Sequence, residues 1–266
     1  MRRLKARLFA GGVALGAALV AALAAALVAG RLAAGWGPLW AGDFPRRELA
    51  GTLYVLGLSL VLTLPPAVGT GAFLAEYARG RGRALRLALE AMSSLPGVTV
   101  GLFGMAVFVE GLHLGFTVLG GAASLALLNL PLLAQVSWRA LEGLPGGLRE
   151  GSLALGVGRS AALDRLLFPR ILPELATGLA VAAGRALGEA AVLAFTGGLG
   201  TGARFSLDPL APGGTLAVYL WYLQGEGHAD GRAAAATAAV LILLMLAWNL
   251  AVGLPARLWA ARRGKE

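Results

Sequence analysis

Two opposite charges lie within one apolar stretch of this sequence. Arg185 and Glu189 are four residues apart between Leu175 and Gly197, and in a continuous helix this spacing places them on one face. A charge at the centre of a membrane helix costs about 2.5 to 3.5 kcal/mol on insertion scales, so such residues face a cavity or a partner. The forked donors of a guanidinium match a tetrahedral oxyanion. We therefore predict that Arg185 lines the path of an anion and that Glu189 holds it in place; an ion pair that only pins helices together is the alternative.

Two uncharged polar residues in apolar stretches, Thr99 and Asn129, are further candidates for such a path. Polar contacts between packed membrane helices explain them equally well. Both interpretations stay open on the sequence alone.

The sequence holds no pattern typical of a catalytic or metal centre. There is no Gly-x-x-x-x-Gly-Lys-Ser/Thr phosphate loop, no Gly-x-Ser-x-Gly elbow and no His-Glu-x-x-His motif. His113 and His228 have no second ligand at metal-binding spacing, and cysteine is absent. An intramembrane enzyme is therefore disfavoured. We expect the chain to bind no cofactor, so that any ATP and Mg²⁺ are used by a separate partner.

The composition is that of a membrane protein. Hydrophobic residues make up 58% of the chain, charged residues only 14%, and the mean hydropathy is +0.74. A soluble domain has about a quarter of its residues charged. The net charge of +9 does not indicate a nucleic-acid partner, because Lys and Arg occur in short runs between long apolar stretches.

Six stretches are long and apolar enough to cross a bilayer as helices, which takes about 20 residues each. They run from Leu8 to Gly30, Gly51 to Leu74, Ala84 to Val109, Phe116 to Trp138, Leu175 to Gly197 and Ala233 to Leu254. The third is interrupted at Pro96-Gly97 after an amphipathic lead-in, and the fifth carries the two charges. We expect an all-α membrane protein whose first span is an uncleaved anchor, since its apolar run exceeds the roughly 7 to 15 residues of a signal-peptide core.

The distribution of positive charge predicts that both termini are cytoplasmic. With the amino terminus inside, most of the 23 Lys and Arg residues fall in cytoplasmic segments. Outside segments hold only Arg31, Arg46, Arg47, Arg204 and Arg232. This positive-inside bias predicts a multi-pass protein of the plasma membrane, the inner membrane in a bacterium.

A long cytoplasmic segment, residues 139–173, separates the fourth and fifth spans. We expect two short helices here, joined at a tight turn in which Gly156 and Gly158 are free to take positive φ. Pro169 is expected to end the second helix. Such a knob could dock in a groove of a soluble ATPase, and an amphipathic helix lying on the membrane is the alternative.

The spacing in this segment resembles the coupling loop of ABC-importer permeases, whose pattern is Glu-Ala-Ala, three residues, Gly, nine residues, Ile-x-Leu-Pro. The matching positions are Glu150, Gly151, Ser152, Gly156, Leu166, Phe168 and Pro169. Gly151 replaces the usual Ala and Phe168 the usual Leu. The resemblance implies that these residues couple the chain to a cytoplasmic ATPase.

Further stretches resemble the PstA-type permease of the phosphate importer. They are Gly51-Thr-Leu-Tyr54, Leu64-Pro65-Pro66, Ala75-Glu76-Tyr77-Ala78, Leu95-Pro96-Gly97-Val98, Gly101-Leu-Phe103-Gly104 and Gly184-Arg185-Ala-Leu-Gly188-Glu189. The resemblance implies a type I importer permease fold over residues 51–257. An amino-terminal tail, first span and outside loop would occupy 1–50, and a cytoplasmic tail 258–266. Two departures bear on the substrate: Gly97-Val98 replaces Ser-Ile, and Ala190-Ala191-Val192 replaces Thr-Ala-Pro.

The same resemblance implies a set of partners. These are a PstC-type permease in a heterodimer, two copies of a cytoplasmic ATPase and a phosphate-binding protein on the outer side, all at a lipid bilayer and without nucleic acid. Import of another oxyanion, such as molybdate or sulfate, is the first alternative. A secondary transporter is disfavoured because no inverted repeat is evident.

Overall fold

The computed structural model describes residues 22–40, 42, 44–78, 82–199, 205–225 and 230–253. Among these, five helices are long and apolar enough to cross a membrane: Ala22–Trp40, Arg46–Tyr77, Val118–Glu142, Arg159–Leu187 and Gly231–Val252. The bent pair Arg83–Ser93 and Gly97–Gly111 makes a sixth crossing if it is one span. The predicted all-α membrane protein is therefore confirmed. The predicted number of six spans is reached when the bent pair is counted as one span.

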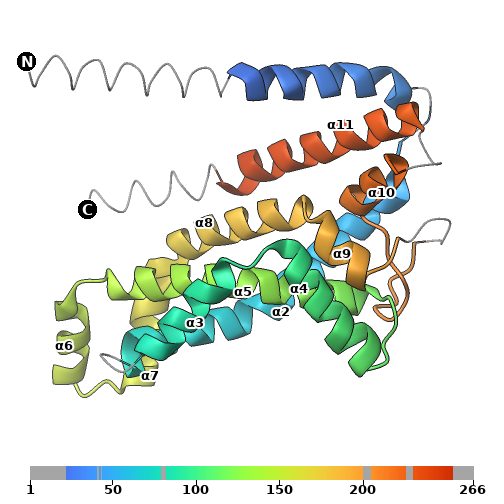
Figure 1. Cartoon of the computed structure of the whole chain (residues 1–266). Helices are drawn as coiled ribbons and strands as arrows, with labels where there is room; N and C mark the ends of the chain where they lie inside the picture. Colours follow the sequence, from blue (N-terminus) through green and yellow to red (C-terminus); the bar gives the residue numbers. More distant parts are fainter. Residues whose placement is uncertain are drawn as a thin grey trace, which may run out of the picture.

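The α-helices follow one another along the chain in the order in which Figure 1 labels them. They are α2 (Arg46–Ala72), α3 (Arg83–Ser93), α4 (Gly97–Gly104), α5 (Val118–Glu142), α6 (Gly146–Ala154), α7 (Arg159–Ala162), α8 (Phe168–Leu187), α9 (Ala190–Thr196), α10 (Leu216–Leu223) and α11 (Gly231–Trp248). In the described part of the chain, four π-helical segments extend or join them: Phe73–Tyr77, Met105–Gly111, Leu163–Leu167 and Asn249–Gly253.

The helices α2 and α5 form the centre of the bundle and make its most extensive pairing. Their backbones approach closely at Gly71, where a Cβ atom would collide with Ser137 and with the carbonyl oxygen of Ala134. Small residues at such a crossing let membrane helices pack without a hydrophobic driving force. Buried aliphatic side chains such as Leu74 and Leu133 form one cluster with Ala134 at this crossing.

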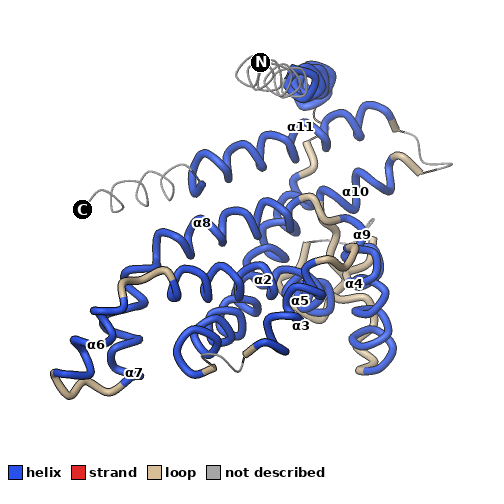
Figure 2. Tube along the Cα trace, turned by 60° about the vertical axis from the view of Figure 1, so that its left-hand side comes forward, coloured by secondary structure: helices blue, strands red, loops and turns tan. Residues whose placement is uncertain are grey.

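The two ends of the bundle are built differently (Figures 1 and 2). One end, here called the loop end, carries α6 and α7, which stand away from the rest of the bundle. The opposite end, the far end, carries α10 and the segment 205–215. Helix Ala22–Trp40 runs from the loop-end side to the far end, and α11 runs back. The first described helix thus starts, and α11 ends, toward the same side of the bundle.

The third span is broken where the sequence predicted. Pro96 has extended backbone angles, with φ −62° and ψ 145°, and directly precedes α4. The helices on its two sides are bent by 102°. The preceding α3 is amphipathic, as expected, and buries Leu89.

The predicted fifth span, from Leu175 to Gly197, is wrong as one continuous helix. The crossing helix instead runs from Arg159 to Leu187 and ends at Gly188, and the separate helix α9 starts at Ala190. The amino-terminal limit was missed because the helix continues from the cytoplasmic segment through the π-helical turn Leu163–Leu167 without a break.

The boundaries at the amino-terminal end also differ from the prediction. Residues 1–21, which contain most of the predicted first span, lie outside the described residues. The described helix continues to Trp40, ten residues beyond the predicted end at Gly30. The tail 258–266 likewise lies outside the described residues.

Candidate functional site

Glu189 lies at the point where two broken spans meet. It is the residue that precedes α9, and its carboxylate accepts a hydrogen bond from the backbone N–H of Val192 at 3.4 Å. The same carboxylate covers Gly97 at the start of α4, where a Cβ atom would lie 2.5 Å from Oε1. A carboxylate is favoured at a helix amino terminus, because free N–H groups and the helix dipole point at it. Glu189 therefore caps α9 and closes the start of α4.

The crossing of α4 and α9 leaves little room for larger residues. A Cβ atom at Gly101 would lie 3.0 Å from the Cα of Val192 and 3.1 Å from the carbonyl oxygen of Ala191. Irregular backbone inside a membrane must be satisfied within the protein. At this crossing the Glu189 carboxylate satisfies the N–H of Val192 in α9.

Arg185 and Glu189 do not form the pair that their spacing predicted. Arg185 lies in the last turn of α8, and the helix ends before Glu189, so the two are not on one helix face. Gly188 separates them as the cap of α8, and Glu189 takes extended angles, with φ −84° and ψ 91°. Within the described chain the half-buried guanidinium of Arg185 has no hydrogen-bond or ion-pair partner.

The two other predicted path residues lie in contrasting surroundings. Thr99 is exposed in the first turn of α4, close in sequence to Gly97. Asn129 is fully buried in α5, with 0% of its surface exposed, and its side-chain oxygen and nitrogen have no hydrogen-bond partner among the described residues. The structure thus brings Glu189 to the start of α4 and places Asn129 in the protein interior.

The segment at the loop end has the expected shape of two helices joined at a tight turn. Gly156 has φ +73°, the left-handed conformation that glycine favours, so this part of the prediction is confirmed. Gly158 does not use the same freedom, because its φ is −62°. Pro169 does not end a helix: it follows the π-helical turn Leu163–Leu167 inside the continuous helix Arg159–Leu187, where its missing N–H removes one helical hydrogen bond.

The turn between α6 and α7 presents apolar side chains to the surroundings. Leu155 is 83% exposed, and Leu153 and Val157 are exposed beside it. Glu150 and Gly151 are exposed on α6, whereas Ser152 is buried and donates a hydrogen bond to the carbonyl of Arg149 at 2.8 Å. Further along the chain Leu166 and Phe168 are half-buried and Pro169 is exposed. The exposed leucines were not among the predicted site residues, although apolar residues in a cytoplasmic turn were a visible signal.

The base of the same loop is held by an ion pair that the sequence did not predict. Arg149 Nε donates to Glu76 Oε1 at 2.7 Å. Glu76 lies in the π-helical turn at the loop end of α2, 73 residues earlier in the chain. No local spacing connects these two residues.

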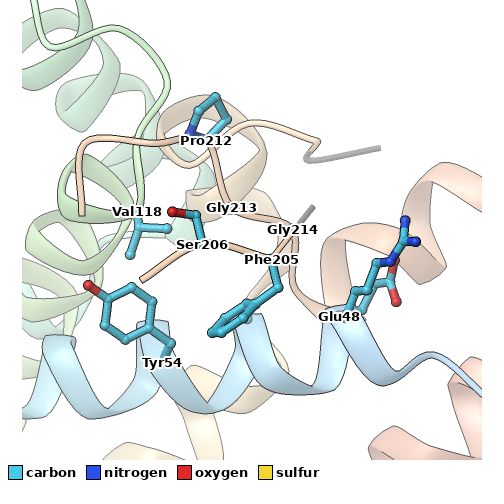
Figure 3. Close-up of a pocket in the computed structure, with 10 residues that line it drawn as sticks. Glu48, Tyr54, Val118, Phe205, Ser206, Pro212, Gly213 and Gly214 are labelled. Carbon is cyan, nitrogen blue, oxygen red and sulfur yellow. The ribbon is translucent and has the colours of Figure 1, made fainter. Parts of the chain in front are cut away.

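The far end contains a small hollow between α2, the start of α5 and the segment 205–215 (Figure 3). Tyr54 donates from its hydroxyl to the carbonyl of Leu207 at 2.7 Å, and its ring packs edge-on against Phe205. Val118 and Gly213 close the opposite side. The backbone N–H of Leu216 donates to the hydroxyl of Thr52 at 2.9 Å, which ties the end of this segment to α2.

Comparison with known proteins gives a family. Residues 67–258 match the family described as the binding-protein-dependent transport system inner membrane component. The chain belongs to this family. It is therefore the permease subunit of an ATP-binding-cassette importer, a multi-pass membrane subunit that works with a second permease, an ATPase and a binding protein.

Several relatives share most of the permease's length. A probable ABC transporter permease protein of Bacillus subtilis, YqgI, is 37% identical over 226 residues, which are 79% of this chain and 77% of the relative. The phosphate transport system permease protein PstA 2 of Mycobacterium bovis is 29% identical, over 82% of this chain and 72% of the relative. A probable PstA of Methanocaldococcus jannaschii is 30% identical, over 75% and 71%.

Solved structures confirm the fold. The MetNI methionine ABC transporter, captured in inward-facing conformations, has a chain that superimposes with a TM-score of 0.61 over 79% of the permease and 92% of that chain. The sequence identity is 18%, so the likeness concerns the fold alone. The predicted type I importer permease fold is confirmed by this match and by the family.

Proposed function

We propose that the permease carries inorganic phosphate inward across the plasma membrane. The observation that carries the choice of an anion is Arg185, a half-buried guanidinium at the end of α8 without a partner among the described residues. A fixed positive charge compensates an anion for the hydration that it loses. The two PstA relatives support phosphate as that anion, while the name of the Bacillus relative gives no substrate.

In this proposal the path residues have separate tasks. Arg185 meets the anion, and Thr99 offers a hydroxyl from the exposed first turn of α4. Glu189 keeps the broken ends of α4 and α9 together, which replaces the earlier hypothesis that it restrains Arg185. Asn129 would reach the path only after a movement of α5, since it is fully buried here.

The turn between α6 and α7 is proposed to dock on the ATPase. Leu153, Leu155 and Val157 form an exposed apolar tip, and Glu150 adds a charge beside it. An apolar centre with a charged rim is the usual anatomy of a protein interface. Gly151, Gly156, Leu166, Phe168 and Pro169 shape the two helices that carry this tip, and ATP and Mg²⁺ are bound by the ATPase.

The complete transporter is proposed to contain a PstC-type permease as the second half of a heterodimer. Two ATPase copies would bind at the cytoplasmic face, and a phosphate-binding protein would deliver the anion from outside. The family supports these classes of partner, and the PstA relatives support their phosphate-specific forms.

The experiment is uptake by the reconstituted transporter. The permease is co-purified with its partner permease, ATPase and binding protein and placed in vesicles that contain ATP. We expect uptake of labelled phosphate that excess phosphate abolishes and that sulfate and molybdate leave unchanged. Uptake of sulfate or molybdate without phosphate would assign the permease to the other oxyanion.

A further inference from the structure

The ion pair at the base of the loop is almost removed from solvent. The side chains of Arg149 and Glu76 are only 11% and 10% exposed, and Nε and Oε1 are 2.7 Å apart. Charges withdrawn from water in this way are costly unless each is paired and hydrogen-bonded. Removing one partner would leave the other uncompensated, so the contact strongly favours one arrangement of the segments that carry the two residues.

The guanidinium of Arg149 joins three elements at once. Besides Glu76 at the end of α2, it donates to the carbonyl of Leu144 at 3.1 Å and to the carbonyl of Leu141. Leu141 lies in the last turn of α5, and its carbonyl, which also accepts from the N–H of Leu144 at 3.3 Å, has no i+4 donor because that residue is Pro145; such a helix end attracts a cation. Arg149 itself belongs to α6. One side chain therefore binds the loop helix to the ends of both central helices.

Apolar packing also holds α2, α5 and the helix that follows α7 together near this ion pair. Ala72 and Ala75 at the end of α2 form one buried cluster with Leu141 of α5, Leu167 and Ile171. The last two belong to the helix that enters the membrane from α7. The tip between α6 and α7, in contrast, is exposed from Leu153 to Ser160. The loop thus has a rigid base and a free tip.

We propose that Glu76 and Arg149 are positioning residues that make the base of the loop one rigid body with the loop ends of α2 and α5. A displacement of the tip is then passed directly to the two central helices, and this contact stays closed throughout the transport cycle. The inference rests on the proposed docking of the tip on an ATPase. It names the residues that transmit the movement of the tip to α2 and α5, and it does not depend on which anion is transported.

A cross-link tests whether the contact stays closed. The chain has no cysteine, so Glu76→Cys with Arg149→Cys gives a single reactive pair in an otherwise clean background. A hollow lined by Glu76, Tyr77, Arg149 and Ser152 admits a short reducible bis-thiosulfonate that spans the two lost side chains. We expect the linked transporter to hydrolyse ATP and take up phosphate at least as well as the same sample after reduction. Arrest by the link, with recovery on reduction, would overturn the proposal, because the contact would then have to open. The two single-cysteine variants, treated identically, control for the reagent.

Charge variants supply a second test that separates this inference from the docking proposal. Glu76→Gln is expected to leave co-purification of the ATPase unchanged but to lower phosphate taken up per ATP hydrolysed by about tenfold, which corresponds to 1.4 kcal/mol of coupling. Arg149→Lys should retain part of the ratio, because an ammonium cannot serve Glu76 and two carbonyls in the same fixed geometry. An unchanged ratio in Glu76→Gln would refute the positioning role. If variants of the exposed tip lose the ATPase on purification, that result bears on the docking proposal and not on the contact between Glu76 and Arg149.

Discussion

At the scale of single residues, Arg185 and Glu189 do not form the ion pair that their spacing predicted. Glu189 has a defined place, between the starts of α4 and α9. Arg185 remains a guanidinium without a partner among the described residues. In the proposed anion path only Arg185 meets the anion, so the two residues give different predictions.

Arg185→Gln removes the fixed charge and keeps hydrogen-bonding capacity. We expect phosphate uptake to fall by about a hundredfold, which corresponds to 2.7 kcal/mol, near the insertion cost of one membrane charge. Arg185→Lys should keep part of the activity, since an ammonium is a point charge and not a fork. Uptake is measured in vesicles at equal amounts of assembled transporter. Near-normal uptake in Arg185→Gln would leave Arg185 as scaffold.

Gly97→Ala tests whether the contact between the Glu189 carboxylate and Gly97 stabilises the permease. The new Cβ would lie 2.5 Å from Oε1, so the carboxylate must leave its place between the two helix starts. We expect a loss of about 1 to 3 kcal/mol, the usual cost of overpacking, seen as a lower melting temperature of the purified permease. Gly97→Ser should lose less, because its hydroxyl can donate to the displaced carboxylate. In the background Glu189→Ala the same Gly97→Ala change should cost almost nothing, and equal cost in both backgrounds would show that the contact is unimportant.

At the scale of elements, the sequence signalled one break in the spans by a proline, and the other break has no proline. Pro96 marks the interruption of the third span correctly, because it restricts the residue before it and lacks a donor. The break before α9 has no proline, and a charged pair four apart looked like one helix face; the available signal was Gly188 followed directly by a capping Glu189. Arg149 and Glu76 could not be paired from the sequence at all, since only the packing of α2 against α5 brings them together.

The turn of the loop offers a matched pair of glycines. Gly156 has φ +73° and Gly158 has φ −62°, and a Cβ atom at either would meet no atom within 4 Å. Gly156→Val should strain the backbone by about 1 to 3 kcal/mol and reduce ATPase co-purification, whereas Gly158→Val should leave it intact. Both variants should insert in the membrane equally. Normal co-purification with Gly156→Val would mean that this turn is not the docking element.

At the scale of the whole molecule, apolar stretches and charge bias predicted the class and the number of crossings. They could not predict α10 or the fold of the segment 205–215, whose position depends on contacts with distant residues such as Thr52 and Tyr54. The sequence also gave no reason to extend the first described helix to Trp40.

Sidedness is the prediction that belongs to the whole chain. Reporter fusions after Ala78, Gly158 and Lys265 should report cytoplasm, and fusions after Gly42 and Gly213 should report the outside, because positive residues gather on the inner side. Ala78 follows the π-helical turn that carries Glu76, Gly158 lies in the turn between α6 and α7, and Gly213 belongs to the segment 205–215. An outside signal after Gly158 would place the tip away from any cytoplasmic ATPase and remove the docking proposal.

The π-helical turns have a consequence for the length of the chain. A π-helical turn contains one residue more than an α-helical turn. Deleting Asp164, within Leu163–Leu167, would convert that turn to α-helix and leave the helices on both sides in register. Deleting Gln135 in α5 would instead rotate everything beyond it by about 100° and shift it by about 1.5 Å. We expect the first deletion to yield inserted, monodisperse protein in size-exclusion chromatography and the second to yield none, and equal yields would contradict this. The four π-helical turns of the described residues are thus places where single-residue insertions and deletions should accumulate as such a protein evolves.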